Sequence, residues 1–203
     1  MADESFDSEA LSGQSEDCDS ETKNQSDKEK GKAGAEEEDD EISAKNKKLI
    51  TSISKVLTAI LEKNKKLKNY TEIVKKQSKM IFSSPQIPNI TISDYLSRIQ
   101  IYSRMEKSTL ILSLIQIDHI CKKANLFLTY FNIHRLLFGA VLISIKFNED
   151  TYYDNLYYSE IAGVKLKELK MIEYTFMELS NFNVFVDHKE YEQYQKHLEK
   201  YDE

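Results

Sequence analysis

The sequence is poor in the residues that tight turns and covalent cross-links need. Among its 203 residues are five glycines, two prolines, two cysteines and no tryptophan. An all-β fold with many hairpin turns needs more glycine and proline than this. Cys18 and Cys121 are too few for a disulfide framework or a four-ligand zinc site. The chain also lacks a basic start followed by an apolar core, so we expect no secretory signal and an intracellular protein in the cytoplasm, the nucleus or both.

Charge is divided unequally along the chain. Residues 1–44 carry 16 acidic and four basic side chains, whereas residues 45–203 carry 18 acidic and 24 basic ones. The net charge of −6 therefore belongs to the N-terminal segment, and the remainder is mildly basic. So small a positive charge is weak support for nucleic-acid binding and suits an acidic protein surface at least as well. Residues 1–46 contain few large apolar residues, which predicts a disordered acidic tail. Several serines lie beside acidic residues and could be phosphorylated, so a regulatory arm is the alternative interpretation.

Apolar residues recur at helical spacing through most of the remaining chain. An amphipathic helix over residues 49–63 should pack on the domain rather than lie on a membrane, because its polar face is only partly basic. A connector follows at 68–92, with a short helical turn at 72–80. Further helices are predicted from an N-cap at Ser93 or Asp94 to 102, from Ser108 or Thr109 to 125, and over 132–150, 156–162 and 165–180, with an exposed helix at the C-terminus. The sequence therefore predicts an all-α protein.

The most apolar of these helices is the one over residues 132–150, with the sequence NIHRLLFGAVLISIKFNED. It carries no charge between Leu136 and Ile145 and is apolar on nearly every side. Ten uncharged residues are too few for a membrane span, which needs about 20. We therefore expect the buried central helix of the domain, with Lys146 at the end of its apolar run.

Motifs for catalysis are missing from the sequence. It has no phosphate-binding loop, no H-E-x-x-H, no serine nucleophile elbow and no kinase motif set. The four histidines lack the spacing of metal ligands. We therefore expect that the protein is not an enzyme and uses no cofactor and no metal. We also expect no nucleic acid, no membrane and no small-molecule substrate among its partners.

Four charged residues lie in or beside very apolar helices: Arg98, Asp118, Lys146 and Glu173. A charge on a buried face is costly unless it is paired and hydrogen-bonded, so internal pairing is the simpler interpretation. We favour this internal pairing for Arg98 and Asp118. Lys146 and Glu173 lie at the edges of apolar stripes, where they could instead be hydrogen-bonding anchors for a partner at the rim of an apolar patch.

The order of these motifs resembles a single cyclin box, closest to the P/U-type cyclins, which include the phosphate-pathway cyclins. The resemblance rests on SDYLSRI, on LIQIDHICKKA, and on HRLLFGAVLISIKFNEDTYYDNLYYSEIAGVKLKELKMIEYTFMELSNFNVFV, and covers roughly residues 86–195. It departs from the family pattern at His119, where an arginine is usual, and at Ala162, where a glycine is usual. It implies five helices around a central one. We divide the chain into a tail (1–46), an N-terminal helix and connector (47–92), a cyclin box (93–185) and a C-terminal helix (186–203).

By this resemblance, the protein is a regulatory subunit that binds a cyclin-dependent protein kinase and activates it by docking on its C helix. In cyclins the residues matching Arg98 and Asp118 usually form an internal ion pair, and those matching Lys146 and Glu173 face the kinase. We predict further kinase contacts from apolar side chains, namely Phe147, Leu142, Phe138 and Met177. The side of the central helix along Arg135, Gly139 and Leu142 should meet the kinase, with Gly139 allowing close approach.

Two points stay open. The alternative function is that of a helical interaction scaffold without a kinase, or of a transcription-type adaptor with a cyclin fold. A single box with a mild positive charge argues against it, because such adaptors usually carry two boxes and a strongly basic face. The tyrosines of the loop at 152–158 could face a partner or pack internally.

Overall fold

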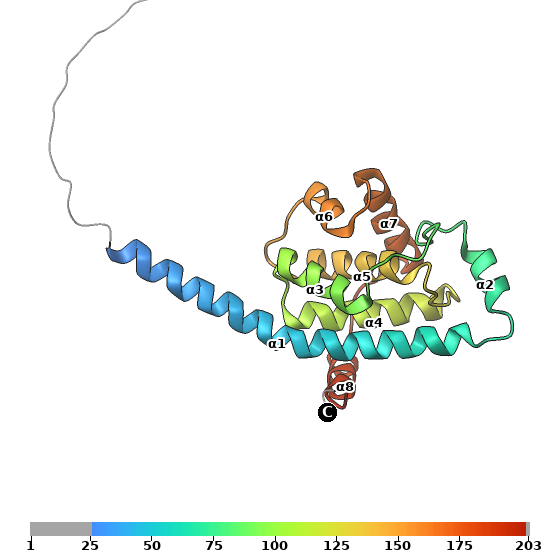
Figure 1. Ribbon diagram of the computed structural model, residues 1–203, viewed down its shortest axis with the longest axis horizontal. Helices are drawn as coiled ribbons and strands as arrows, with labels where there is room; N and C mark the ends of the chain where they lie inside the picture. Colours follow the sequence, from blue (N-terminus) through green and yellow to red (C-terminus); the bar gives the residue numbers. More distant parts are fainter. Residues whose placement is uncertain (1–25, 202–203) are drawn as a thin grey trace, which may run out of the picture. The chain divides into compact units, whose positions relative to one another are not determined.

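The computed structural model describes residues 26–201, with side chains from Asn46 onward. This part of the chain contains eight α-helices and no strand. They are α1 (Ser26–Lys65), α2 (Tyr70–Gln77), α3 (Ile92–Ser103), α4 (Lys107–Lys123), α5 (Ile133–Asn148), α6 (Asn155–Ala162), α7 (Leu166–Leu179) and α8 (His188–Glu199) (Figure 1). The all-α prediction is confirmed. Within residues 26–201, no helix is both long and apolar enough to cross a membrane.

The chain divides into two units between residues 36 and 37, and the site and the pocket described below lie in residues 37–203. Helix α1 begins well before the predicted position. Residues 1–25 of the predicted disordered tail lie outside the described residues, whereas residues 26–45 are helical. This stretch is rich in alanine, glutamate and lysine, which have high intrinsic helix propensity. Our prediction of disorder considered only how little apolar surface the stretch could bury.

The later part of α1 packs on the domain as predicted. Its apolar stripe, Leu49, Ile50, Ile53, Leu57 and Leu61, is buried in the hydrophobic core. Burying a leucine or isoleucine side chain contributes roughly 1.5–3 kcal/mol. The stripe therefore fixes this part of α1 on the helical domain.

Helix α5 lies at the centre of the domain, with α4 and α7 packed against it (Figure 1). Every residue from Leu136 to Ile145 is buried, so the predicted central helix is confirmed. At Gly139 an added Cβ would lie 3.0 Å from Ile172 Cγ2 and 3.2 Å from Phe176 Cδ2. This glycine therefore allows α7 to approach closely. The prediction that Gly139 lets a kinase approach is wrong, because α7 occupies that side of α5.

The connector ends in a helix cap that we placed two residues too late. Thr91 has an extended backbone, and its hydroxyl accepts a hydrogen bond from the Asp94 N–H, so Thr91 rather than Ser93 or Asp94 is the N-cap of α3. Similarly, Glu106, rather than the predicted Ser108 or Thr109, is the N-cap residue of α4. Gly163 ends α6 as predicted, in the left-handed conformation that favours glycine (φ 69°).

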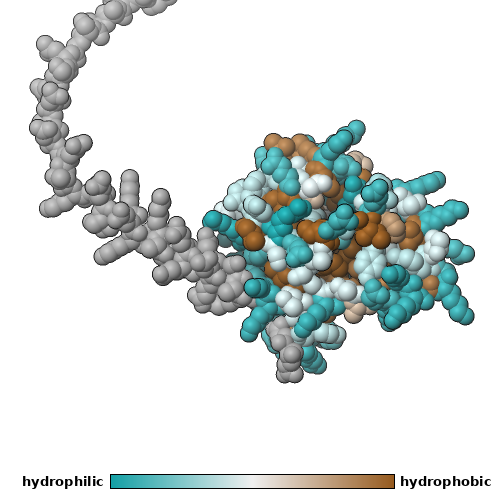
Figure 2. Space-filling view, in the orientation of Figure 1, coloured by the Kyte–Doolittle hydropathy of each residue, from teal (hydrophilic) through white to brown (hydrophobic). Residues whose placement is uncertain are grey.

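In Figure 2, apolar side chains gather at the centre of the face on which α3 lies, within a polar rim.

Candidate functional site

Lys146, Asn155 and Glu173 form a closed ring of hydrogen bonds near the C-terminal end of α5. Lys146 Nζ lies 2.6 Å from Glu173 Oε1 and 2.7 Å from Asn155 Oδ1. The amide of Asn155 donates from Nδ2 to Glu173 Oε2 at 2.7 Å. Helices α5, α6 and α7 each supply one side chain, so the packing of three helices fixes the position of the ring.

The ring is partly open to solvent: 24% of the Lys146 side chain and 22% of the Glu173 side chain are exposed. An ammonium group has three N–H donors, and the ring uses two of them. Each carboxylate oxygen of Glu173 accepts one bond within the ring and keeps a further lone pair. The ring thus presents one strong donor and several acceptors at the surface, which suits the free backbone groups of another protein.

Each residue of the ring is followed in the sequence by an exposed apolar or aromatic side chain. Phe147, Leu156 and Tyr174 each follow a ring residue directly in the sequence and are 59%, 54% and 55% exposed. A polar centre beside apolar and aromatic side chains is the composition of a protein-binding surface. Phe147 is one of the predicted kinase contacts, and its exposure leaves it available to a partner. Our sequence reasoning missed Asn155, Leu156 and Tyr174.

A second group of apolar residues lies one turn further along α7. Met177 is half-buried, and its carbonyl accepts a hydrogen bond of 2.8 Å from the N–H of Phe182. The Phe182 side chain is exposed, although it stands in a loop directly after an apolar helix. Sequence reasoning also missed Phe182. The apolar spacing of NFNVFV was a usable signal, since it leaves large apolar residues without a helix to bury them.

Two of the predicted kinase contacts are wrong. Phe138 is 1% exposed and Leu142 is fully buried, so neither side chain is available to a partner. Phe138 packs against the Tyr95 ring of α3, and α7 lies against the neighbouring Gly139. Arg135 belongs to the same internal contact: its guanidinium donates to Ile81 O at 3.0 Å and pairs with Glu168 at 3.1 Å.

The predicted ion pair between Arg98 and Asp118 is also wrong, because each residue has other partners. Arg98 Nη2 donates to Ile161 O at 2.6 Å, and its guanidinium lies 5.3 Å from the centre of the Tyr95 ring. Asp118 pairs with Lys122, one turn further along α4, at 2.6 Å. The Tyr194 hydroxyl on α8 also donates to Asp118.

The tyrosine-rich loop divides into packed and exposed residues. Tyr158 is buried, and Tyr157 donates from its hydroxyl to Tyr102 O at 2.9 Å. Tyr152 and Tyr153 are exposed.

His119, which replaces the usual arginine, contacts Glu190 at 2.8 Å. Among the described residues, no group of three or more His, Cys, Asp or Glu side chains could hold a metal ion.

The described part of the chain is thus an all-α domain with a partly exposed polar ring and exposed apolar side chains. A family model described as Cyclin matches residues 14–184. Cyclin-U4-1 from Arabidopsis thaliana is 31% identical over 156 residues, which cover 75% of each chain. Cyclin-P3-1 from Oryza sativa subsp. japonica is 28% identical, over 75% of this chain and 64% of its own length.

A fungal relative, the PHO85 cyclin-like protein psl1 from Schizosaccharomyces pombe, is 31% identical over 170 residues, covering 78% of this chain and 70% of its own. The chain therefore belongs to the cyclin family and is of the P/U type. Cyclins are regulatory proteins rather than enzymes, and at the level of the family their role is the regulation of cyclin-dependent kinases.

Proposed function

We propose that this protein is a regulatory subunit that binds a cyclin-dependent protein kinase and activates it by docking on the kinase C helix. The observation that carries the proposal is the ring of Lys146, Asn155 and Glu173, partly exposed and set among exposed apolar side chains. Membership of the cyclin family supports the class of partner. A kinase partner implies that the protein acts in the cytoplasm, the nucleus or both.

In the proposed complex, the polar ring binds backbone groups of the kinase beside its C helix. The third N–H of Lys146 donates to a backbone carbonyl, and the lone pairs of Glu173 accept from backbone N–H groups. Phe147 and Met177 bind the apolar side of the same helix, and Leu156, Tyr174 and Phe182 extend this contact. Phe138 and Leu142 contribute only by supporting α5 from within the core.

Activation follows from differential binding. A kinase is active when a glutamate of its C helix pairs with the lysine of strand β3 that holds the ATP phosphates. A cyclin shifts the kinase toward this arrangement only if it binds it more tightly than the inactive one. The ring and its apolar surroundings are positioned by three packed helices, so they provide a surface that only one placement of the C helix fits.

An exchange of the two charges tests this proposal. In Lys146→Glu/Glu173→Lys the ion pair is kept and only its direction is reversed, and the Asn155 amide can rotate to satisfy both new neighbours. We expect normal folding but loss of binding, because donor and acceptor now face the wrong backbone groups. The kinase is first identified by capture from the source cells. The affinity of the kinase for the original protein and for the exchanged variant is then measured by calorimetry, and the activity of the kinase with each is measured by peptide phosphorylation.

Removing an ion pair elsewhere provides the matched control. Lys196 and Glu192 form an exposed pair on α8, with a distance of 3.7 Å. The double substitution Lys196→Ala/Glu192→Ala should leave kinase affinity unchanged. If the exchanged variant binds and activates the kinase as the original does, the ring is not the docking site and the proposal fails.

A further inference from the structure

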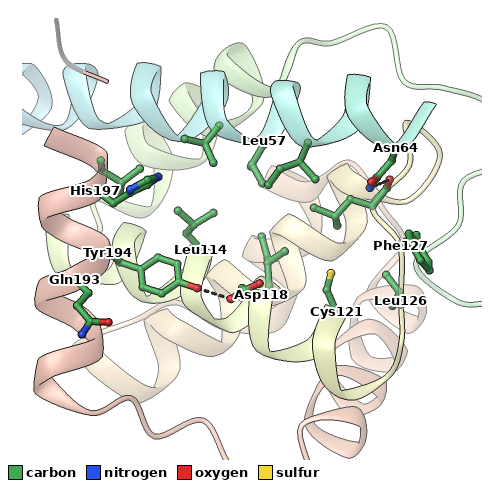
Figure 3. A pocket seen from close by; sticks show the side chains of 15 residues that line it. Leu57, Asn64, Leu114, Asp118, Cys121, Leu126, Phe127, Gln193, Tyr194 and His197 are labelled. Carbon is green, nitrogen blue, oxygen red and sulfur yellow. Dashed lines mark hydrogen bonds between the residues drawn. The ribbon is translucent and has the colours of Figure 1, made fainter. Parts of the chain in front are cut away.

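A pocket of about 510 Å³ lies on elements that the proposed kinase surface does not use. Figure 3 shows side chains converging on it from four sides: α1 along the top, α8 on the left, α4 below and the segment 126–128 on the right. Most of its wall is apolar, with Leu57, Ile60, Leu114, Ile117, Leu126 and Leu198 among the lining residues. A volume of this size is typical of sites for small molecules, which occupy roughly 300–1,000 Å³.

One carboxylate lies in this apolar wall. Asp118 accepts a hydrogen bond from the Tyr194 hydroxyl and pairs with Lys122 at 2.6 Å, and both contacts reach the same oxygen, Oδ2. The other oxygen, Oδ1, is bonded to no donor in the described part of the chain. The Asp118 side chain is 35% exposed, so the carboxylate lies at the edge of the apolar wall. A negatively charged acceptor in this position favours a ligand that brings a hydrogen-bond donor, above all a cationic one.

The other titratable groups nearby leave Asp118 Oδ1 as the acceptor for a ligand. Burial raises the pKa of the Cys121 thiol to about 12, so this pocket residue is uncharged at neutral pH. Burial and the bond to Asp118 also raise the pKa of Tyr194, which therefore remains a neutral donor. Lys122 pairs with Asp118 Oδ2 at 2.6 Å and is 71% exposed, so it offsets part of the charge of Asp118 from the solvent side but does not occupy Oδ1.

We propose that this pocket binds a small amphipathic molecule with an apolar body and a primary ammonium group, which donates to Asp118 Oδ1. The apolar body would fill the space between Leu57, Leu114 and Leu198, and the ammonium would lie beside the carboxylate. The bound ligand would contact α1, α4 and α8 at the same time.

The shape favours a small molecule over a peptide. A peptide in a groove enters at one end and leaves at the other, whereas here side chains from four segments surround the space, which suits a compact ligand (Figure 3). The chain's own N-terminal segment is strongly acidic and would bring further carboxylates to Asp118. Charge complementarity therefore disfavours it as the occupant.

Three probes that differ only in their polar group test the proposal: 4-phenylbutylamine, 4-phenylbutanol and 4-phenylbutyrate. Binding to the full chain is followed by changes in amide chemical shifts and by calorimetry. We expect the amine to bind at least about tenfold more tightly than the alcohol, since a charge-assisted hydrogen bond is roughly twice as strong as a neutral one. The carboxylate should bind most weakly, and the shift changes should map to α1, α4 and α8.

Substitution of Asp118 separates the charge from the shape. In Asp118→Asn the side-chain oxygen can still accept from Tyr194, so we expect the amine to lose its advantage and bind within about twofold of the alcohol. Glu192→Gln on α8 removes a carboxylate outside the pocket and should keep the tenfold preference. If Asp118→Asn does not fold, Ile60→Trp at the partly exposed rim provides a second variant, which should weaken all three probes.

Two results would overturn the proposal. One is equal affinity of the original protein for the three probes, and the other is shift changes that map away from the pocket. Neither depends on kinase binding, because the ring lies on α5, α6 and α7, whereas the pocket lies on α1, α4, α8 and residues 126–128.

Discussion

Two basic residues of this domain, Arg98 and Lys146, are held in different ways. Arg98 binds the backbone carbonyl of Ile161 in the last turn of α6 and packs on the Tyr95 ring. Within the described part of the chain, Lys146 binds the side chains of Asn155 and Glu173. A carbonyl in a helix ties Arg98 to the backbone of the fold, whereas the side chains that hold Lys146 are partly exposed and can form further hydrogen bonds with a partner. The first arrangement therefore serves the fold, and the second suits recognition.

The position of Arg98 strengthens this contrast. Its guanidinium lies at the C-terminal end of α6, where the helix dipole favours a positive charge. The hydroxyl of Tyr95 donates to Ala162 O at 3.3 Å, so α3 forms two hydrogen bonds with the same end of α6. Arg98 thus joins two helices through the backbone, without an acidic partner.

The largest difference between residues of the fold and residues of the surface should appear within α5. Leu142→Ala should lower the free energy of unfolding by about 2–5 kcal/mol, because it leaves a cavity in the core. Phe147→Ala should change it by less than about 0.5 kcal/mol, since this side chain is mostly exposed. Phe147→Ala should instead weaken kinase binding. Urea denaturation and calorimetry measure the two effects, and similar unfolding free energies for both variants would contradict the burial pattern.

Arg98→Ala should lower the free energy of unfolding by about 2–3 kcal/mol, the cost of losing a hydrogen bond from a charged group and leaving a carbonyl unpaired. Lys146→Met should cost less than about 1 kcal/mol, because its ion pair is partly exposed. Urea denaturation of both variants measures this difference. Equal losses would show that the two cations do not differ in their contribution to the fold.

Asn155→Ala tests whether the ring acts as a unit. The loss of two hydrogen bonds should leave Lys146 and Glu173 less well positioned and reduce kinase affinity by about fivefold, equivalent to about 1 kcal/mol. Asn148→Ala is the control, since its amide binds Ser108 and Thr109 outside the ring. Calorimetry with the identified kinase measures both, and an equal effect of the two substitutions would show that the ring has no special role.

The smallest effect is expected from a second ion pair between α5 and α7, that of Arg135 and Glu168. The Lys165 N–H and the Arg135 guanidinium hold the pKa of Glu168 below its ordinary value of 4.5. A lowered pKa in the folded state means that Glu168 contributes stability at neutral pH, which is lost as the pH falls from about 4.5 through the folded-state pKa.

The stability of the original protein should therefore fall more steeply between about pH 5 and pH 3 than that of Glu168→Gln. Urea denaturation across this pH range measures the difference. The effect should be small, because Glu168 is partly exposed and solvent screens its charge. Parallel pH profiles for the two proteins would show that this pair contributes nothing to stability.

The helices could be predicted because their apolar spacing is a local property of the sequence. Lys146 and Glu173 stood out as charges at the edges of apolar stripes. Asn155 did not, because a polar residue at the start of a short helix usually faces solvent. Only the approach of α6 to α5 and α7 brings its amide into the ring.

The wrong predictions have a shared cause in tertiary structure. The partners of Arg98 and Asp118 are a backbone carbonyl and a tyrosine of α8, a helix that we expected to be exposed. Phe138 and Leu142 lie on a helix that is apolar all round, and such a sequence does not tell which sides other helices cover. The burial of both depends on the helices packed around α5, such as α3, whose Tyr95 ring lies 6.4 Å from that of Phe138, and the sequence does not specify the paths of these helices.

The closed ring also has a consequence for the entropy of association. A free lysine side chain loses up to about 2 kcal/mol of rotamer entropy when it is fixed, and a glutamate loses a similar amount. Here Lys146 and Glu173 are already restrained by each other and by Asn155 before any partner arrives. Most of that loss belongs to folding, so a partner helix that meets this surface keeps more of the interaction energy as affinity.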